Sequence, residues 1–200
     1  MHHEERRAQL LKLASDLFAR KGFHRSTTKE IARRAKVSEA MIFKHFPSKE
    51  ELFAACLDMK ARLEDPLAVV AEAAEKRDDA AVFGGIGRHL IERVEKDPAF
   101  LRLLLFTALE HPKLFDAFFE AHVRRIQEFL TQYISLRIAD GVLKPLDPFL
   151  MARSFIGMVS HYLLAQEIFG LKKKFPIDRD KALEIFVQIF LDGAGRDREE

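Results

Sequence analysis

Apolar side chains recur at helical intervals along most of the chain. They fall at i, i+3, i+4, i+7 and i+8 in two segments, residues 4–21 and 179–192, which predicts an amphipathic helix in each. These apolar positions are Leu10, Leu13, Ala14, Leu17 and Phe18 in the first segment and Ala182, Ile185, Phe186, Ile189 and Phe190 in the second. Glycine and proline are sparse and no strand-like alternation lies between turn signals, so we expect an all-α protein.

Capping residues and prolines divide the rest of the chain into further helices. Asp-Pro, His-Pro or Asp-Gly pairs mark several of the boundaries. Residues 1–47 are expected to form a three-helix N-terminal domain, and residues 48–200 a larger helical C-terminal domain, with about nine helices in all. The helices expected after the first three lie at about 49–63, 66–76, 80–96, 98–110, 113–139, 148–169 and 179–192.

Three helix starts follow one another within residues 22–53, whose sequence is GFHRSTTKEIARRAKVSEAMIFKHFPSKEELF. Thr27, with Glu30 three residues later, forms a capping box ahead of a helix that ends near residue 35. Ser38 caps a second short helix that ends before the next proline, and Ser48 caps a third. The first two helices are separated by so few residues that they predict a helix-turn-helix.

The second short helix is expected to bury one side and expose the other. Ile42 and Phe46 lie one turn apart and would be buried. A major groove about 12 Å wide admits one helix, so the outward side chains can reach base edges. Those outward side chains are Glu39, Ala40, Phe43 and Lys44.

The positive charge of the chain is concentrated near its start. The whole chain has a net charge of +2, but residues 1–50 hold twelve Lys or Arg against six Asp or Glu. Binding to the phosphates of nucleic acid requires such a basic region. A solvated basic face explains an excess of this size equally well, so the charge alone does not identify a partner.

The run TTKEIARRAKVSEAMIFKHFPSKEELF resembles the signature of the tetracycline-repressor-like (TetR family) transcriptional regulators, T-T-x-x-I-A-x-x-A-G-V-S-x-G-x-L-Y-x-H-F-x-[ST/N]-K-E-x-L. The match covers roughly a quarter of the chain. The resemblance implies an all-helical homodimer that binds a double-stranded DNA operator containing an inverted repeat. It also implies a repressor that leaves the operator when a small molecule binds.

Three positions depart from this signature. Lys36 replaces the usual turn glycine, so a left-handed backbone there would be strained unless the turn differs. Ala40 stands where glycine is common, and Phe43 stands where the family usually has a tyrosine that hydrogen-bonds a phosphate. Without the hydroxyl, Phe43 offers only apolar contact, for instance to a thymine methyl.

We expect the dimer to place its two second helices in successive major grooves, at half-sites about 34–36 Å apart or at a related spacing. Contacts to bases would come from Lys44 and the exposed parts of Glu39, Ala40, Met41 and Phe43, which follow the cap Ser38. Contacts to phosphates would come from Thr28, Arg33, His45, Lys49 and the free amides after Ser48.

The helices expected at 148–169 and 179–192 carry more apolar surface than one small bundle needs. We expect them to pair with their copies across a twofold axis in a four-helix interface. The residues alone support an internal core stripe equally well, and the resemblance favours the dimer.

Aromatic residues are frequent after the N-terminal domain, since 13 of the 18 Phe lie after residue 53. Apolar walls with a few polar groups are typical of a small-molecule site, so we expect an apolar effector of aromatic or acyl character. Taken singly, each residue is better explained as part of the core. The candidate ligand-binding residues are Phe100, Phe106, His111, Phe115, Phe118, Phe119, His122, Phe155 and Tyr162.

The sequence contains no G-x-S-x-G, P-loop, H-E-x-x-H or Cys-His metal motif, so we assign no catalytic residue, metal ligand or cofactor. His89 and Glu92, three residues apart, leave a helical metal-dependent enzyme as an alternative. A helical adaptor protein without DNA binding is a third interpretation. The GGIG at residues 84–87 follows no strand, so close helix packing or a softened helix explains it better than phosphate binding.

A single cysteine, Cys56, excludes an intramolecular disulfide and is expected to be buried and unreactive. No run of 18 apolar residues is present, and the start MHHEERR has no apolar signal segment. We therefore expect a cytoplasmic protein that does not enter a membrane.

Overall fold

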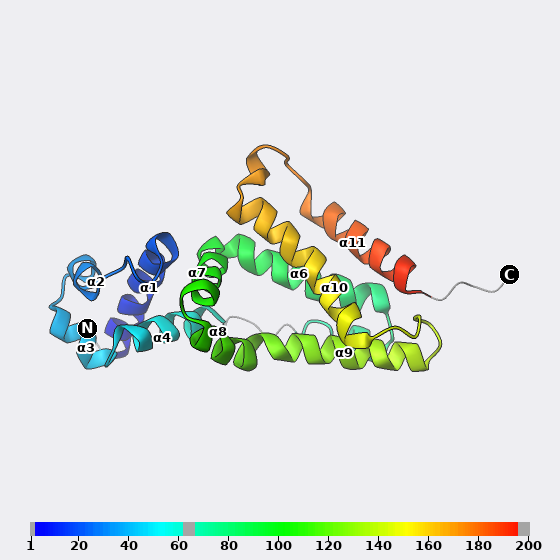
Figure 1. Cartoon of the computed structure of the whole chain (residues 1–200), viewed down its shortest axis with the longest axis horizontal. Coiled ribbons are helices and arrows are strands. Elements are labelled where there is room, and N and C mark those ends of the chain that lie inside the picture. The colour runs from blue at the N-terminus through cyan, green and yellow to red at the C-terminus, as the bar shows by residue number, and fades with distance from the viewer. Residues whose placement is uncertain (1–2, 62–66, 196–200) are drawn as a thin grey trace. The chain divides into compact units, whose positions relative to one another are not determined.

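The computed structural model describes residues 3–61 and 67–195, and in these ranges the chain is helical with no extended strand (Figure 1). The predicted all-α class is confirmed. The described residues form two compact units. Unit 1 holds the residues up to Ala61 together with Asp97–Ala121, and unit 2 holds residues 67–96 together with 122–195.

Unit 1 contains the predicted helix-turn-helix and the helices that pack around it. The helix α1 contacts α2, α4 and α7, while α2 contacts α3, and α4 also contacts α7 and α8. Packing therefore groups α4, α7 and α8 with the N-terminal helices, whereas a functional division after residue 47 stays a prediction. The helices of this unit are α1 (His3–Lys21), α2 (Thr28–Ala35), α3 (Glu39–His45), α4 (Lys49–Ala61), α7 (Pro98–Glu110) and α8 (Pro112–Phe118).

An aromatic cluster fills the core of unit 1. Phe18 and Phe53 are fully buried, and their ring centroids lie 4.8 Å apart, edge to face. Phe23, from the turn after α1, lies 5.1 Å from Phe53. Such pairs contribute about 0.5–1.5 kcal/mol beyond the burial of their area. The cluster therefore holds α4 and the turn after α1 against α1 itself.

Gly22 ends α1, as the sequence predicts, with a left-handed backbone at φ +76°. A Cβ atom at this position would lie 2.8 Å from Oε1 of Glu110 and 3.3 Å from the ring of Phe106. Both the backbone and the close approach of α7 therefore require glycine.

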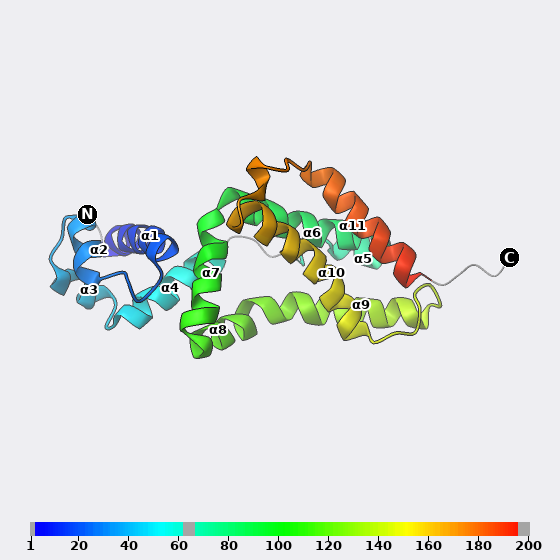
Figure 2. The ribbon, with the colours of Figure 1, turned by 45° about the horizontal axis from the view of Figure 1, so that its top comes forward.

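Unit 2 is built around α10, which contacts α6, α9 and α11, while α11 also contacts α6 (Figure 2). A π-helical turn, η1 (Phe119–Val123), connects α8 to α9 across the boundary between the units. The other elements are α5 (Ala71–Glu75), α6 (Asp79–Lys96), α9 (Arg124–Ala139), α10 (Pro148–Leu163), the π-helical turn η2 (Leu164–Ile168), the 3-10 turn η3 (Leu171–Lys173) and α11 (Arg179–Ala194).

Three phenylalanines form the centre of unit 2. Phe83 of α6 lies 5.0 Å from Phe155 of α10 and 4.7 Å from Phe190 of α11, measured between ring centroids. Beside them, a Cβ added at Gly87 would overlap the side chain of Leu183. The structure thus supports close packing at Gly87, because a larger residue there would separate α6 from α11, whereas a Cβ added at Gly84 would meet nothing within 4 Å.

A buried charge network joins the start of α6 to the end of α9. Arg137 donates to both carboxylate oxygens of Asp79, at 2.8 and 3.0 Å, and to Asp140 at 2.7 Å. The hydroxyl of Tyr133 donates to Asp79 at 2.6 Å. Burial, followed by the hydrogen bond to Asp79, raises the pKa of Tyr133.

Several predicted helices differ in extent from the observed ones. The helix expected at 66–76 is limited to α5, because turns occupy residues 67–70 and the described chain offers α5 no side-chain N-cap. The end of α4 expected at Leu63 lies outside the described residues. The helices expected at 113–139 and 148–169 contain π-helical turns, which a period of 3.6 residues cannot reveal.

If each interrupted helix is taken as continuous, the described residues hold ten helices, as many as the ranges expected from the sequence and one more than the rounded total of about nine. None of these helices combines the length and the apolar composition that crossing a bilayer would require.

Candidate nucleic-acid interface

Side-chain caps fix the N-termini of α2 and α3. Thr27 Oγ1 accepts the N–H of Glu30 at 3.1 Å, and Ser38 Oγ accepts the N–H of Met41 at 3.3 Å. The carboxylate of Glu30 accepts from Lys21 at 2.8 Å and from Arg34 at 3.1 Å, so it does not serve the second half of the predicted capping box. The bond from Lys21 lowers the pKa of Glu30 and links the end of α1 to α2.

The turn between α2 and α3 is left-handed at Lys36, with φ 56° and ψ 45°. The N–H of Val37 bonds the carbonyl of Ala32 at 3.0 Å, which closes the turn. A non-glycine residue in this conformation costs roughly 1–2 kcal/mol. The turn therefore has the left-handed backbone that is usual for glycine, although Lys36 occupies the position and strains it.

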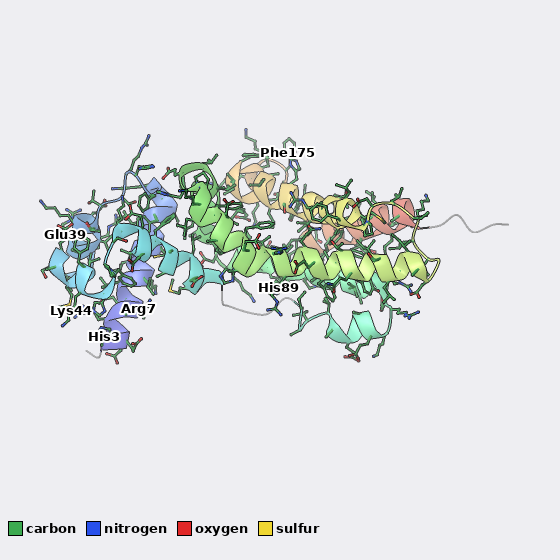
Figure 3. All side chains as sticks on the ribbon, turned by 60° about the horizontal axis from the view of Figure 1, so that its bottom comes forward. His3, Arg7, Glu39, Lys44, His89 and Phe175 are labelled. Atoms are coloured by element: carbon green, nitrogen blue, oxygen red, sulfur yellow. The ribbon has the colours of Figure 1, made fainter. Side chains whose placement is uncertain are left out.

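The seven-residue helix α3 has one buried and one exposed side. Ile42 is fully buried and Phe46 nearly so, whereas Glu39, Ala40 and Lys44 are exposed. Figure 3 shows Glu39 and Lys44 at the outer edge of unit 1. Phe43 is 44% exposed, so an apolar ring is available on the same helix. The predicted orientation of α3 is therefore observed, and the contacts to bases stay predictions.

Glu39 and Thr28, assigned separately to bases and to phosphates, contact each other. The hydroxyl of Thr28 donates a hydrogen bond to the carboxylate of Glu39, joining the first residues of α2 and α3. A carboxylate held there repels phosphate and can accept only from a donor such as the amino group of cytosine. Glu39 is thus better suited to fixing the angle between the two helices than to adding affinity.

Two basic side chains of this surface are available to a partner. Arg33 on α2 and Lys44 on α3 are exposed, and neither forms an ion pair with any residue in the described ranges. An unpaired guanidinium or ammonium at the surface can bind phosphate or the edge of guanine without first breaking a bond.

His45 packs against the start of α1 and is only partly exposed. Its ring lies 4.3 Å from that of His3, and its Nδ1 atom is buried without a hydrogen-bond partner among the described residues. Burial, followed by the charges of His3 and Lys44, lowers the pKa of His45. The lowered pKa disfavours the charged imidazolium, which would bind a phosphate most strongly, and the phosphate contact of His45 stays a prediction.

Lys49 also differs from the expectation. Its ammonium lies 4.0 Å from the centroid of the Phe23 ring, a cation–π contact, and burial lowers its pKa. The amide of Glu51 at the start of α4 donates to Ser48 Oγ at 3.0 Å, which confirms the third predicted helix start. Contact between Lys49 and a phosphate would require its side chain to leave the aromatic ring.

Glu110 is a structural contributor that the sequence does not reveal. Its Oε2 atom accepts the N–H of Phe23 at 2.9 Å and that of His24 at 3.3 Å. The residue stands at the end of α7, 87 positions from Phe23, so no local pattern connects them. It fixes the turn that precedes the helix-turn-helix.

The nine candidate ligand-binding residues are divided between the two units. In unit 1, Phe100 and Phe118 are buried with ring centroids 6.1 Å apart, and His111 packs edge to face on Phe23 at 4.1 Å. The side chains that are partly exposed here or on η1 are those of Phe106, Phe115, Phe119 and His122.

In unit 2, Phe155 lies in the core against Phe83 and Phe190, so it does not line a ligand site within that unit. Tyr162 lines a groove of about 620 Å³ between α10, η2, the following loop and α11. Phe175, 63% exposed, projects beside it (Figure 3). The groove is otherwise lined by Gly157, Met158, His161, Ala165, Gln166, Leu171, Ile177 and Phe186.

The walls of this groove are largely apolar, and Gln166 offers a polar atom within them. Its Oε1 is buried and has no hydrogen-bond partner in the described part of the chain. Apolar walls with a buried acceptor suit an apolar small molecule that carries a hydrogen-bond donor. Gln166, with His161 and Tyr162, is among the polar side chains that accompany the aromatic residues in this part of the sequence.

Two family models match the chain. Residues 10–56 match the model described as bacterial regulatory proteins, tetR family. Residues 86–193 match the model described as AefR-like transcriptional repressor, C-terminal domain.

Individual transcriptional regulators are also similar to this chain in sequence. The chain is 48% identical to the HTH-type transcriptional activator FasR of Mycolicibacterium smegmatis over 54 residues, which are 27% of this chain and 25% of FasR. It thus matches about a quarter of FasR's length. It is 25% identical to the HTH-type transcriptional regulator YvkB of Bacillus subtilis over 199 residues, which are 94% of this chain and 97% of YvkB.

Solved structures share the fold over almost the whole chain. AibR in complex with isovaleryl coenzyme A and operator DNA matches with a TM-score of 0.68 and 22% identity, over 92% of this chain and 97% of AibR. NalD, the secondary repressor of the MexAB-OprM multidrug efflux pump in Pseudomonas aeruginosa, matches with a TM-score of 0.70 and 20% identity, over 98% of this chain and 100% of NalD. At these identities the likeness establishes the fold.

Proposed function

The chain belongs to the tetR family of bacterial regulatory proteins, and we propose that it is a cytoplasmic repressor that binds an inverted-repeat operator as a homodimer and leaves it when an effector binds. The observation that carries this proposal is the outer face of α3. This helix exposes Lys44 beside the apolar ring of Phe43, and it is anchored from behind by the buried Ile42.

In the proposed complex, α3 lies in the major groove and α2 contacts the backbone. Lys44 reads a base edge, and Phe43 packs against a thymine methyl or a sugar. Arg33 binds a phosphate and positions the helix without reading sequence. The bond between Thr28 and Glu39 keeps the angle between α2 and α3 fixed, so that both contacts are made together.

The proposed dimer uses the exposed faces of α10 and α11. Ile185 is 42% exposed and Ile189 58% exposed, one turn apart on α11. On α10, Phe149 is 50% exposed and Leu150 61% exposed. Apolar side chains in such a stripe are stabilised by a second copy of the chain, and the twofold axis then sets the spacing of two α3 helices.

The effector is proposed to be a small apolar molecule of aromatic or acyl character. The groove lined by Tyr162, Phe175 and Gln166 supports this class of ligand. AibR, a relative in fold, has been solved with isovaleryl coenzyme A. Release from DNA requires that the effector bind the two conformations of the dimer with different affinities, since equal affinities shift no population.

An enzymatic function has less support. His89 and Glu92, the pair that left a metal-dependent enzyme open, do not face a common site. His89 is buried within α6, and Oε1 of Glu92 lies 3.9 Å from Nη2 of Arg179, its ion-pair partner. We therefore propose that the protein is not an enzyme. A helical adaptor would share the fold and would have no affinity for DNA.

Selection of bound fragments from a random duplex library tests the proposal directly. The full chain is incubated with the library at about 0.15 M salt, because weak electrostatic binding is screened under that condition. We expect enrichment of one inverted repeat with half-sites about one helical turn, or a related spacing, apart. Recovery of unrelated sequences, or of none, would reject sequence-specific regulation and favour the adaptor.

A further inference from the structure

Three side chains that can bind metal meet in unit 1, outside the surface proposed for DNA. His24 belongs to the turn between α1 and α2, Glu110 ends α7, and His111 lies between α7 and α8. One ligand atom from each residue lies within 4.8 Å of the others. In the ranges 3–61 and 67–195 this is the one group of His, Cys, Asp or Glu with that property.

The fold holds two of these residues in place. Oε2 of Glu110 accepts the amides of Phe23 and His24, and Gly22 leaves room for the same carboxylate. The ring of His111 packs edge to face on Phe23 at 4.1 Å and lies 5.9 Å from Phe53. The hydrogen bonds and the aromatic contacts are made by the same turn, so the turn and the end of α7 are fixed to each other.

The third residue can move to complete a coordination shell. His24 is exposed, and its ring lies 5.4 Å from that of His111, at 26° between their planes. Ligand atoms around a tetrahedral Zn²⁺ at about 2.0–2.1 Å are about 3.3 Å apart. Since the observed separations are at most 4.8 Å, side-chain rotations that shorten them by about 1.5 Å or less close the site, and the exposed His24 has the most freedom to make one.

His111 also has a nitrogen without a partner. Its Nε2 atom is buried, and no described residue within reach forms a hydrogen bond with it. An unsatisfied buried polar atom costs free energy, and a bond to a metal ion would recover that cost. Glu110 uses one oxygen for two amides, which leaves the lone pairs of Oε1 available.

We propose that His24, Glu110 and His111 bind a divalent transition-metal ion such as Zn²⁺. Two imidazoles and one carboxylate are a ligand set that Zn²⁺, Co²⁺ and Ni²⁺ accept, and three protein ligands leave a fourth position for water. The bound ion joins the turn before α2 to the corner between α7 and α8. It stabilises unit 1 without any contact to DNA, so this proposal does not depend on the proposed function.

Titration of the purified, chelator-treated full chain with Co²⁺, followed by visible absorption, tests the site. We expect one Co²⁺ per chain at this site, and a matching Zn²⁺ isotherm by calorimetry. His24→Ala should weaken the affinity at least tenfold, whereas His24→Asp, which supplies a carboxylate, should restore most of it. The matched control is His161→Ala, an exposed histidine of unit 2, which should bind as the wild type does.

His2 and His3 are adjacent in the sequence and can bind metal without a folded site. The titration is therefore repeated with a His2→Ala, His3→Ala double variant, which should retain the one-equivalent site. Zn²⁺ should raise the Tm of this variant and should raise it less once His24→Ala is added, because binding to the folded state alone is stabilising and the stabilisation falls with affinity. Loss of all binding in the double variant, or unchanged affinity in His24→Ala, would overturn the proposal.

Discussion

The outer face of α3 in unit 1 and the outer face of α11 in unit 2 differ in chemistry and in how they are held. The seven-residue α3 exposes Glu39, Ala40 and Lys44 and is fixed by a cap, a left-handed turn and one buried isoleucine. The 16-residue α11 exposes Ile185 and Ile189 and is held by a long packed stripe. The first face is largely polar, whereas the second leaves apolar side chains in contact with water.

This difference separates two kinds of structural determinant. A short helix has little area to bury, so its position depends on capping hydrogen bonds and turn geometry that are each worth about 0.5–2 kcal/mol. A long amphipathic helix is positioned by many apolar contacts, and its surplus apolar surface indicates a partner. Substitutions should therefore affect recognition in unit 1 and assembly or stability in unit 2.

The largest expected effect on stability is in the charge network of unit 2. Asp79→Ala removes two hydrogen bonds from Arg137 and the acceptor of the Tyr133 hydroxyl. The loss is costly because the side chain of Arg137 is only 9% exposed, so water cannot replace these bonds. Breaking a buried pair in this way costs about 3–5 kcal/mol. Urea unfolding measures the loss. The exposed pair Arg88–Asp180 is the control, since Asp180→Ala should cost at most about 1 kcal/mol.

The next effect is on assembly. Replacing Ile185 and Ile189 together by Asp puts two carboxylates into the proposed interface, and we expect the dissociation constant of the dimer to rise about a hundredfold, or about 2.7 kcal/mol. Sedimentation velocity across a concentration series reports it. Val69→Asp alters another exposed apolar residue of unit 2 and should leave the dimer intact. A double variant that dimerises as tightly as the wild type would place the interface elsewhere.

A smaller effect is expected at the turn before α3. Lys36→Gly relieves a side chain at φ 56°, and should stabilise the protein by up to about 1 kcal/mol after the greater flexibility of glycine in the unfolded chain is included. Thermal unfolding measures the gain. Arg77 also has φ 56° and lies outside the helix-turn-helix, so Arg77→Gly is the comparison variant. That substitution also removes the ion pair between Arg77 and Asp140. Destabilisation by Lys36→Gly would mean that the turn is not strained.

The smallest effect concerns pH. Because the pKa of His45 is lower in the folded protein than its ordinary value of 6.5, the unfolded chain binds the proton more readily. The free energy of unfolding should therefore fall as the pH drops through that value, and His45→Gln should reduce this fall. Unfolding at pH 7.5 and pH 5.5 tests the sign. Equal pH dependence in the two proteins would show that the surroundings of His45 do not disfavour its charge.

The features predicted from sequence are those controlled by neighbouring residues. Thr27, Ser38 and Ser48 each cap the helix that follows them, and Gly22 ends α1, because capping and left-handed turns act over a few positions. The inward direction of Ile42 follows from its spacing to Phe46. The family signature covers the same stretch, so both the helix-turn-helix and its outward face are accessible from sequence.

The features that the sequence does not reveal depend on distant contacts. The bonds from Glu110 to the turn at Phe23, and the packing of His45 against His3, join residues that share no local pattern. Phe155 was a plausible ligand contact by composition, yet three helices enclose it with Phe83 and Phe190. The residue type gives the chemistry of a side chain, whereas its neighbours depend on how the whole unit packs.

One binding profile tests the proposal that α3 reads bases while α2 contacts the DNA backbone. The affinities of the wild type, Lys44→Ala and Arg33→Ala are measured for every single-base variant of the selected half-site, at two salt concentrations. Lys44→Ala should lose about 1–3 kcal/mol of discrimination at one base pair, whereas Arg33→Ala should weaken all sequences alike and lower the salt slope by about 1. If Lys44→Ala instead weakened every sequence equally, α3 would not be the helix that reads the operator.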